Sequence, residues 1–477
     1  MSAKKTKYDL TNGPILQKLV ALSLPIMATS FMQMAYSLTD TFWMGILSRD
    51  YGASGAVAAV GTAALYLWLS MGLISLCRMG AEIGVSQNMG RGDPEAAKGF
   101  AQNAIVMSIV LGLIYSVIMI IARRPLIGFF NIADPTVVLQ AEQYLAVTAI
   151  GLPAIFVHNV ITGCFNGFGN TKLPFYINSL GLALNIALSP LLIFGFGLGI
   201  VGAALGTVIA TLVNVALKFW AIKFYRNRPF DDFSFRFVID KAKQLQIFKW
   251  GGPVAAESMI FTFLFMVVSR LVADFGTEAI AAHRVGYQVE ALSFMVGGGF
   301  AMAYGSFVGQ NYGAKKWSRL YSGYKISLSV MAIYGLVITF VLFAFAQPLV
   351  SIFLNNVDEV QMGADYLRII ALTQLLFCME GVAVGSFRGR GLTMKPTITS
   401  AGSNILRVIV TYALAATAMG INGVWAGIAI AMTVKSIWLL VWHWYNGRRL
   451  PKVDEPMEVA EDKAAEIAED KAAEAAI

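Results

Sequence analysis

FNGFGNTKLP at residues 165–174 has a counterpart, FRGRGLTMKP, at residues 387–396. Further pairs follow in the same order at nearly the same offset: Pro25 with Pro253, Ala58-Ala59 with Ala281-Ala282, SQNMG (86–90) with GQNYG (309–313), and GIVG (199–202) with GING (420–423). Several matches in one order are hard to obtain by chance, so the chain contains an internal repeat. The repeat predicts two halves of similar construction.

The composition indicates a membrane protein. Hydrophobic residues make up 57% of the 477 positions and charged residues 13%, whereas soluble proteins carry roughly 45–50% apolar and 25% charged residues. Mean hydropathy is +0.65. Apolar runs long enough to cross a bilayer as helices recur along the chain. We predict twelve spans, approximately at residues 15–46, 52–80, 97–122, 136–162, 173–196, 199–224, 244–274, 278–306, 321–346, 360–386, 396–419 and 422–446.

Six spans in each half form an even repeat, so both halves have the same orientation in the membrane. We therefore predict an all-α polytopic fold of two parallel six-helix lobes, with a binding site at their interface. The predicted divisions are a cytoplasmic segment 1–14, a first lobe 15–224, a basic linker 225–243, a second lobe 244–446 and an Ala/Glu/Lys-rich cytoplasmic tail 447–477. The QN pairs of the repeat are expected at joints after the second helix of each half.

Basic residues lie at alternate joints between the predicted spans. One set includes Lys98, Lys172, Arg319, Lys395 and Arg448, whereas the opposite joints hold Arg49, Arg123 and Arg124 and little else that is basic. Basic loops stay in the cytoplasm, so both termini are expected there, in the inner membrane of a prokaryote. The net charge of +8 is explained by these loops, and we expect contact with membrane lipid and none with nucleic acid.

Two parallel helical repeats with a site between them are typical of secondary transporters, and the sequence offers no nucleotide site or metal site that would power transport. There is no GxxxxGK[ST] phosphate loop, the three histidines show no ligand spacing, and Cys77, Cys164 and Cys378 lie in or beside apolar spans. We expect no cofactor and no enzymatic activity. An ion gradient remains as the energy source, so ionisable residues inside the membrane become the candidate sites.

Asp40 is the clearest of these residues. It lies in MQMAYSLTDTFWMGIL (residues 32–47), where Gln33, Ser37 and Asp40 recur at i, i+4 and i+7 on one face of an apolar helix. A carboxylate at the bilayer centre costs roughly 2.5–3.5 kcal/mol on insertion scales. Such a group can exchange a proton or hold Na⁺. The alternative is a structural aspartate bonded to hydroxyl groups.

The second half contains three further acids in predicted spans: Glu257, Glu290 and Glu380. Tyr287 precedes Glu290 by three residues on the same helical face. Carboxylates among aromatic rings suit lipophilic cations, which are attracted to both. Alternatively, these acids pair with the intramembrane Arg270, Arg284 and Arg407 and are purely structural. Arg78 and Glu82, one turn apart, are expected to form an ion pair.

Together these segments resemble the multidrug and toxic compound extrusion (MATE) transporters of the MOP flippase superfamily. The similarity covers roughly residues 10–446. It is carried by Leu24-Pro25, Thr39-Asp40-Thr41, Ala58-Ala59-Val60-Gly61, Gln87, Gly199 with Gly202, Ala281-Ala282-His283, Gln310 and the turn at residues 387–391. The order and twofold recurrence of these short motifs make the match specific.

The resemblance implies a V-shaped pair of lobes that exports cationic, often aromatic compounds in exchange for H⁺ or Na⁺. It assigns cation coupling to Asp40, with Asn185 and Thr207 as polar companions. Many members carry a second acid at the position of Ser189, so a two-carboxylate site is not expected here. Glu257 resembles an acid near the start of the family's seventh helix. Glu380 lies about one turn from the position of a helix 10 acid in the NorM branch, which favours protons over Na⁺.

Our leading prediction is therefore a monomeric, proton-coupled exporter of small cationic compounds, with substrate contacts sought among Gln33, Ser37 and the second-half candidates. The nearest alternative is a flippase for lipid-linked sugars or another amphiphile, which needs a strongly basic cavity to hold pyrophosphate. An intramembrane enzyme is a more distant alternative, for which His283, Tyr287 and Glu290 are the only faint constellation.

Overall fold

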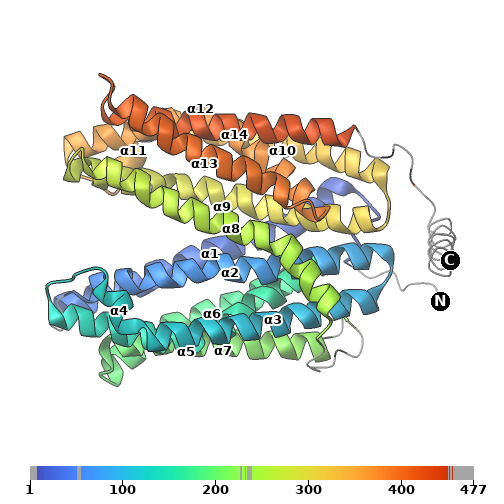
Figure 1. The fold of residues 1–477 in the computed structure, drawn as a ribbon, viewed down its shortest axis with the longest axis horizontal. Helices are drawn as coiled ribbons and strands as arrows, with labels where there is room; N and C mark the ends of the chain where they lie inside the picture. Colours follow the sequence, from blue (N-terminus) through green and yellow to red (C-terminus); the bar gives the residue numbers. More distant parts are fainter. Residues whose placement is uncertain are drawn as a thin grey trace, which may run out of the picture.

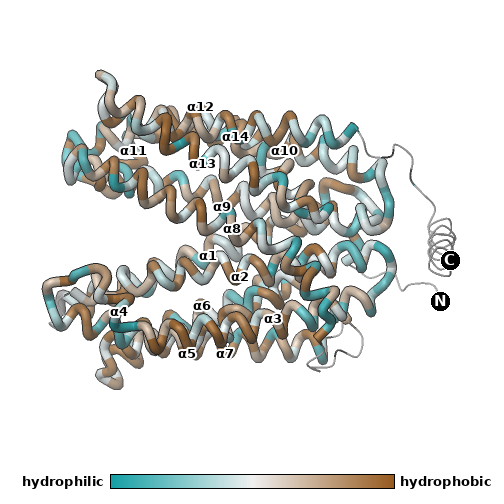
Figure 2. Tube along the Cα trace, in the orientation of Figure 1, coloured by the Kyte–Doolittle hydropathy of each residue, from teal (hydrophilic) through white to brown (hydrophobic). Residues whose placement is uncertain are grey.

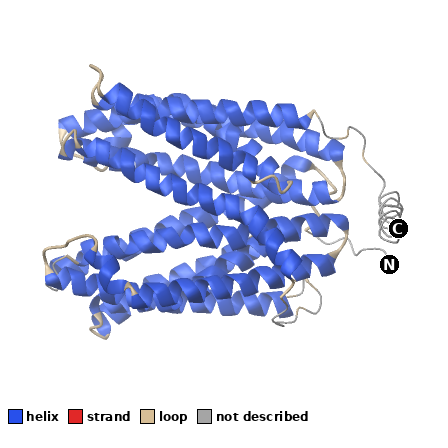
Figure 3. Ribbon diagram, viewed as in Figure 1, coloured by secondary structure: helices blue, strands red, loops and turns tan. Residues whose placement is uncertain are grey.

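The computed structural model describes residues 8–50, 55–225, 228–230, 233, 239–448, 451 and 454. Among these residues there are helices and loops but no strand (Figure 3). Twelve helices are long and apolar enough to cross a membrane. They are α1 (Ile15–Asp50), α2 (Ala56–Arg91), α3 (Pro94–Ile121), α5 (Pro135–Phe168), α6 (Lys172–Pro190) with the π turn η1 (Leu191–Gly195), α7 (Gly199–Phe224), α8 (Lys241–Ala273), α9 (Thr277–Gly313), α10 (Trp317–Ala344), α12 (Val357–Gly389), α13 (Met394–Ala415) and α14 (Ile421–Gly447). The all-α, twelve-span prediction is confirmed.

The second helix of each half is longer than predicted. Helix α2 runs on to Arg91 and α9 to Gly313, so Gln87 and Gln310 lie inside helices and not at joints. Helix α2 ends where Gly92 adopts a left-handed conformation (φ 78°), which glycine reaches without a steric cost. The polar residues of these final turns made the helices appear shorter in the sequence.

Other boundaries differ for local reasons. Pro190 cannot donate a backbone hydrogen bond, and the wide turn η1 follows it directly. Short helices α4 (Arg123–Gly128) and α11 (Ala346–Ser351) occupy equivalent places after the third long helix of each half. Most of the predicted tail 447–477 and about half of the linker 225–243 and of segment 1–14 lie outside the described residues, so those divisions stay predictions.

Helices α1–α7 form one lobe and α8–α14 the other (Figure 1). The first helix of each lobe begins against the opposite lobe. Leu19 and Leu22 of α1 pack in a core cluster with α9 and α10, whereas Met44, near the other end of α1, packs with α2 and α5. Correspondingly, Ile247 of α8 packs among first-lobe residues, and Val268 packs within the second lobe. Each first helix therefore ties the two lobes together.

One end of the molecule, here named the basic end, carries the start of α1 and the turns joining α2 to α3 and α12 to α13, with Arg91, Lys316 and Lys395 nearby. Figure 2 shows hydrophilic residues concentrated at this end and hydrophobic residues along the helices. Large apolar side chains remain exposed on α3 and α10, among them Ile114, Ile121, Ile333 and Phe340. In a membrane these side chains contact the lipid acyl chains, which shield them from water although they are not buried in the protein.

Candidate functional site

Asp40 lies beside hydroxyl and amide groups from two other helices of the first lobe. The Thr207 hydroxyl of α7 donates to Asp40 Oδ2 (3.4 Å), and the Asn185 amide of α6 donates to Thr207 Oγ1 (3.0 Å). Asp40 Oδ1 and Asn185 Oδ1 are buried and have no hydrogen-bond partner in the part of the chain that the structure describes. Among the described residues no basic side chain lies within 4.0 Å of the Asp40 carboxylate, so nothing in this part of the chain neutralises its charge directly.

Two neighbouring side chains were not predicted for this cluster. Tyr36 of α1 interacts with Asn214 of α7 and with the charge of Asp40. Asn214 fits because Gly181 of α6 has no side chain, since a Cβ there would lie 2.1 Å from Asn214 Nδ2. Thr207 and Asn214 are seven residues apart and share one helical face, which is the sequence signal that was available. Gln33 and Ser37 are exposed on α1 and join none of the hydrogen bonds of the Asp40 cluster.

Glu290 is the corresponding buried acid of the second lobe. It accepts from the Tyr366 hydroxyl (2.5 Å) and the Gln374 amide (3.3 Å), both from α12. The Gln374 side chain also accepts from Ser293 (2.7 Å). Glu290 is 1% exposed and has no ion pair within 4.0 Å among the described residues. Arg407 acts on it electrostatically from a greater distance.

An aromatic group adjoins Glu290. The ring of Tyr287 lies 5.1 Å from that of Phe265 and 6.3 Å from that of Phe294. His283 stacks on Trp425 (5.1 Å), and both of its ring nitrogens are buried without hydrogen-bond partners. His283 therefore packs as an aromatic ring, and the faint catalytic constellation with Tyr287 and Glu290 lacks the hydrogen bonds that a nucleophile and base would need.

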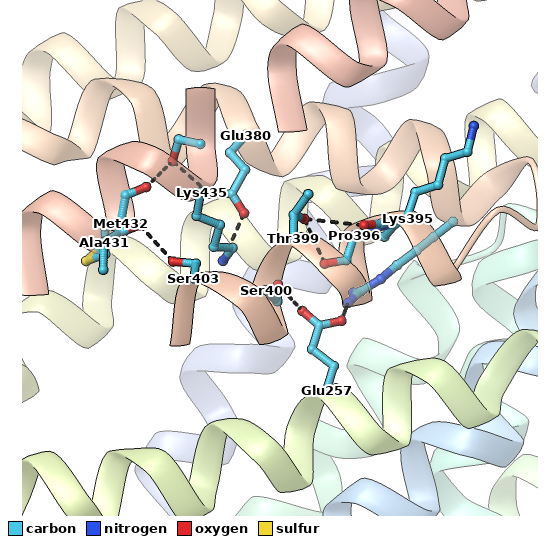
Figure 4. A network of polar contacts seen from close by, with 12 residues as sticks. Glu257, Glu380, Lys395, Pro396, Thr399, Ser400, Ser403, Ala431, Met432 and Lys435 are labelled. Atoms are coloured by element: carbon cyan, nitrogen blue, oxygen red, sulfur yellow. Dashed lines mark hydrogen bonds and ion pairs between the residues drawn. The ribbon is translucent and has the colours of Figure 1, made fainter. Parts of the chain in front are cut away.

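Glu257 and Glu380 are held in ion pairs, but not with the arginines considered from the sequence. Glu257 pairs with Arg388 (3.0 Å) and accepts from Ser400 (2.7 Å). Glu380 pairs with Lys435 (2.9 Å) and accepts from Ser436 (2.8 Å). Figure 4 shows Glu257 and Glu380 in this polar network between α8, α12, α13 and α14. The alternative that these acids pair with Arg270, Arg284 or Arg407 was wrong. The sequence of a single helix does not show which other helices it contacts, so the true partners could not be predicted.

The predicted Arg78–Glu82 ion pair is also absent from the described residues. Arg78 Nη2 contacts the Met302 sulfur (3.1 Å), and Glu82 accepts from the Ser306 hydroxyl (3.0 Å). Both contacts cross to α9 of the other lobe. Arg78 and Glu82 are one turn apart, but each has a partner on the facing helix α9, so they contact that helix and not each other.

Gln87 and Gln310 close the lobe interface at the basic end through equivalent hydrogen bonds. The Gln87 amide donates to the carbonyl of Gly389 (2.9 Å), and the Gln310 amide donates to the carbonyl of Gly167 (2.9 Å). Both glutamines are buried, at 4% and 3% exposure. We name this pair of contacts the glutamine latch. The two acceptor glycines occupy equivalent positions in the repeated FNGFG and FRGRG turns.

The segment before α1 crosses the same end. The backbone N–H of Leu10 donates to Gln310 Oε1 (3.0 Å), Arg319 Nη1 donates to the Gly13 carbonyl (2.9 Å), and Tyr8 stacks near Phe168 of the first lobe (5.5 Å). Burial acts to raise the pKa of Asp9, but hydrogen bonds from Thr11 and Asn12 outweigh it and hold that pKa below its usual value. Asp9 is therefore ionised at neutral pH.

Comparison with known proteins gives one consistent result. The MatE family model matches residues 25–191 and 253–413, one stretch in each lobe. A probable multidrug resistance protein NorM of Thermotoga maritima is 26% identical over 447 residues, covering 90% of this chain and 93% of that protein. The multidrug export protein MepA of Staphylococcus aureus is 23% identical over 399 residues, covering 83% and 87%. A crystal structure of MATE in complex with MaD3S superposes with a TM-score of 0.86 at 23% identity, covering 94% of this chain and all of that one.

The family model covers most of both lobes, and the fold agrees with a solved member over nearly the whole chain. The chain therefore belongs to the MatE family, the MATE transporters.

Proposed function

We propose that this protein is a secondary antiporter that exports cationic, lipophilic or aromatic compounds in exchange for protons, with Asp40, Asn185 and Thr207 as the coupling site. The observation that carries the proposal is the Asp40 carboxylate: it lies in a membrane-spanning helix, one of its oxygens has no partner, and no described basic group is near. An ionised carboxylate in that setting costs roughly 2.5–3.5 kcal/mol on insertion scales. Binding a proton removes the charge and most of that cost.

Na⁺ is the alternative coupling ion at this site. The oxygens of Asp40, Asn185 and Thr207 converge from three helices, and hard cations prefer oxygen ligands. Only one of these groups carries a negative charge. A single carboxylate favours a proton, which needs one charged oxygen and no coordination shell.

Coupling requires that Asp40 has a different proton affinity in the two end states of the transport cycle. Helix α1 begins against the second lobe and ends, beyond Asp40, in the first-lobe core. A movement of one lobe past the other therefore bends or shifts the helix that carries Asp40. The Thr207 contact at 3.4 Å is long for a hydrogen bond, and a small displacement of α1 breaks or strengthens it. We propose that this change alters proton affinity between the two states.

We propose that the basic end faces the cytoplasm, as the positive-inside rule requires. The glutamine latch then closes the cytoplasmic side. The substrate region lies between the lobes, where the aromatic group of Tyr287, Phe265 and Phe294 near Glu290 suits a lipophilic cation. The names of the relatives NorM and MepA point to multidrug export, and we extend that activity to this chain. Glu257 and Glu380, already neutralised by ion pairs, serve mainly to hold the second lobe together.

The test is efflux of an aromatic cation from inside-out vesicles under an imposed pH gradient or Na⁺ gradient, with wild type beside Asp40→Asn. Wild-type transport driven by the pH gradient and lost in Asp40→Asn supports the proposal. Transport driven only by Na⁺ assigns the same site to the other ion. Absence of cation transport under both gradients, together with accumulation of a lipid-linked precursor on deletion of the gene, establishes the flippase instead.

A further inference from the structure

A cluster of basic side chains in the first lobe has no part in the function proposed above. Lys218 of α7 is 0% exposed, and its Nζ donates to the Thr162 hydroxyl (2.7 Å) of α5. The same Nζ lies 3.2 Å and 3.3 Å from the two ring nitrogens of His158. Among the described residues no carboxylate lies within 4.0 Å of Lys218. Its partners are all neutral or basic, which is unusual for a fully buried lysine.

Arg78 of α2 adds a guanidinium to this cluster, and a guanidinium keeps its positive charge. Within the described ranges its Nη2 contacts the Met302 sulfur alone (3.1 Å), and its Nε is buried without a hydrogen-bond partner. The charge of Arg78 acts on both His158 and Lys218. Glu82 lies one turn along α2 and the two charges attract each other, but its carboxylate accepts from Ser306 and forms no ion pair within 4.0 Å with the guanidinium. The guanidinium therefore has donors that no described side chain uses.

Arg78 and His158 border a partly open cavity, and Lys218 lies behind His158 and Thr162. Its lining includes Arg78, His158, Thr162, Asn178 and, from α1, Gln33. None of the lining side chains that the structure describes is acidic. Gln33 also belongs to the exposed stripe of α1 that leads to Asp40, seven residues or about 10 Å farther along the helix. The cavity thus adjoins the path between the lobes.

Arginine does not release its proton in proteins, and an unpaired charge in a low-dielectric site is unfavourable until a counter-charge arrives. The planar guanidinium offers two parallel N–H donors that match the two oxygens of a carboxylate. We propose that Arg78, backed by His158 and Lys218, forms a subsite for the carboxylate of an amphiphilic substrate. This inference rests on the export function and widens its substrates from simple cations to zwitterions, whose cationic end is directed towards Asp40.

Two dyes that differ only at the carboxylate test the proposal. Rhodamine 19 carries a free carboxylate, and rhodamine 6G is its ethyl ester. Both are offered to inside-out vesicles containing wild type, Arg78→Gln, Arg78→Lys or Lys218→Met. Arg91→Gln is the control, an exposed arginine on the same helix. We expect Arg78→Gln to raise the apparent KM for rhodamine 19 by at least about tenfold, the scale of a lost charge-assisted hydrogen bond, and to leave rhodamine 6G nearly unchanged. Arg78→Lys should recover part of the loss.

Equal effects of Arg78→Gln on the two dyes would overturn the subsite and assign Arg78 a structural role. Equilibrium binding of rhodamine 19 to the purified full-length protein, measured by fluorescence polarisation, distinguishes failure of the subsite from failure of the export function. If neither dye is transported by wild type, export is wrong, but weaker rhodamine 19 binding by Arg78→Gln still supports the subsite. If rhodamine 6G is transported and rhodamine 19 binds wild type and Arg78→Gln equally, export stands and the subsite is refuted. Lys218→Met is compared with the other variants only if it elutes as a folded species in the same way as wild type.

Discussion

Removal of the glutamine latch should shift the protein towards the state that is open at the basic end. Gln87 and Gln310 each donate one hydrogen bond of 2.9 Å to a carbonyl of the opposite lobe, and Gln310 also accepts from Leu10. A buried group that loses its partner costs about 1–3 kcal/mol. These bonds form only in the conformation in which the lobes touch at the basic end, so losing them destabilises that conformation alone. Each Gln→Ala change should then alter the ratio of states about 5- to 150-fold.

The assay is the distance between spin labels on Leu139→Cys of α5 and Val357→Cys of α12, measured in lipid nanodiscs. Both positions are well exposed (56% and 81%) and lie at the end opposite the latch. The native cysteines are buried and should label poorly.

We expect the distance distribution of Gln87→Ala to shift to shorter values, and that of Gln310→Ala to shift by a similar amount, because each variant loses one hydrogen bond between the lobes. The matched control is Gln361→Ala, since Gln361 is exposed and bonds only to Asp365 of its own helix. A double variant Gln87→Ala/Gln310→Ala with the wild-type distribution would refute the reasoning.

Two further predictions follow from the packing and the ion pairs. Gly90→Ala should prevent closure of the basic end and abolish transport, because the new Cβ would lie 2.0 Å from the Gln310 carbonyl oxygen. The control is Gly61→Ala on the same helix, whose Cβ would meet nothing within 4 Å and which should transport normally. Equal transport rates of the two variants in vesicles would contradict this. Glu380→Gln should reduce the free energy of unfolding by about 1–3 kcal/mol by leaving Lys435 unpaired, while Glu290→Gln should alter transport with little change in stability. Thermal unfolding in detergent, paired with dye efflux, distinguishes the two, and a larger stability loss for Glu290→Gln would count against the assignment.

The repeat and the hydropathy pattern were sufficient to predict the twelve spans, because both are local properties of a helix that lies in lipid. They placed the QN pairs at joints because polar side chains usually mark a helix end. In the structure these side chains remain in the helix and find carbonyl partners on the opposite lobe, at Gly389 and Gly167. A sequence read one helix at a time shows a polar face but not the surface that meets it.

The same limit applies to the candidate sites. Asp40 stood out in the sequence alone, but Asn185 and Thr207 were assigned only through the family resemblance, and Tyr36 was missed. For Glu257 and Glu380 of the second lobe, pairing with Arg270, Arg284 or Arg407 was the structural alternative. Their partners, Arg388 and Lys435, come from helices distant in the sequence, and helical periodicity does not say which faces of two helices are apposed.

Proton release on substrate binding tests the coupling role of Asp40 most directly. Tetraphenylphosphonium, a cation with no proton of its own, is added to purified protein in weakly buffered solution near neutral pH with a pH-sensitive dye. If Asp40 carries the coupling proton, wild type should release a proton as the cation binds, and Asp40→Asn should release little or none while the conservative Asp40→Glu retains the response. Equal release by wild type and Asp40→Asn would contradict the account and move the coupling site away from helix α1.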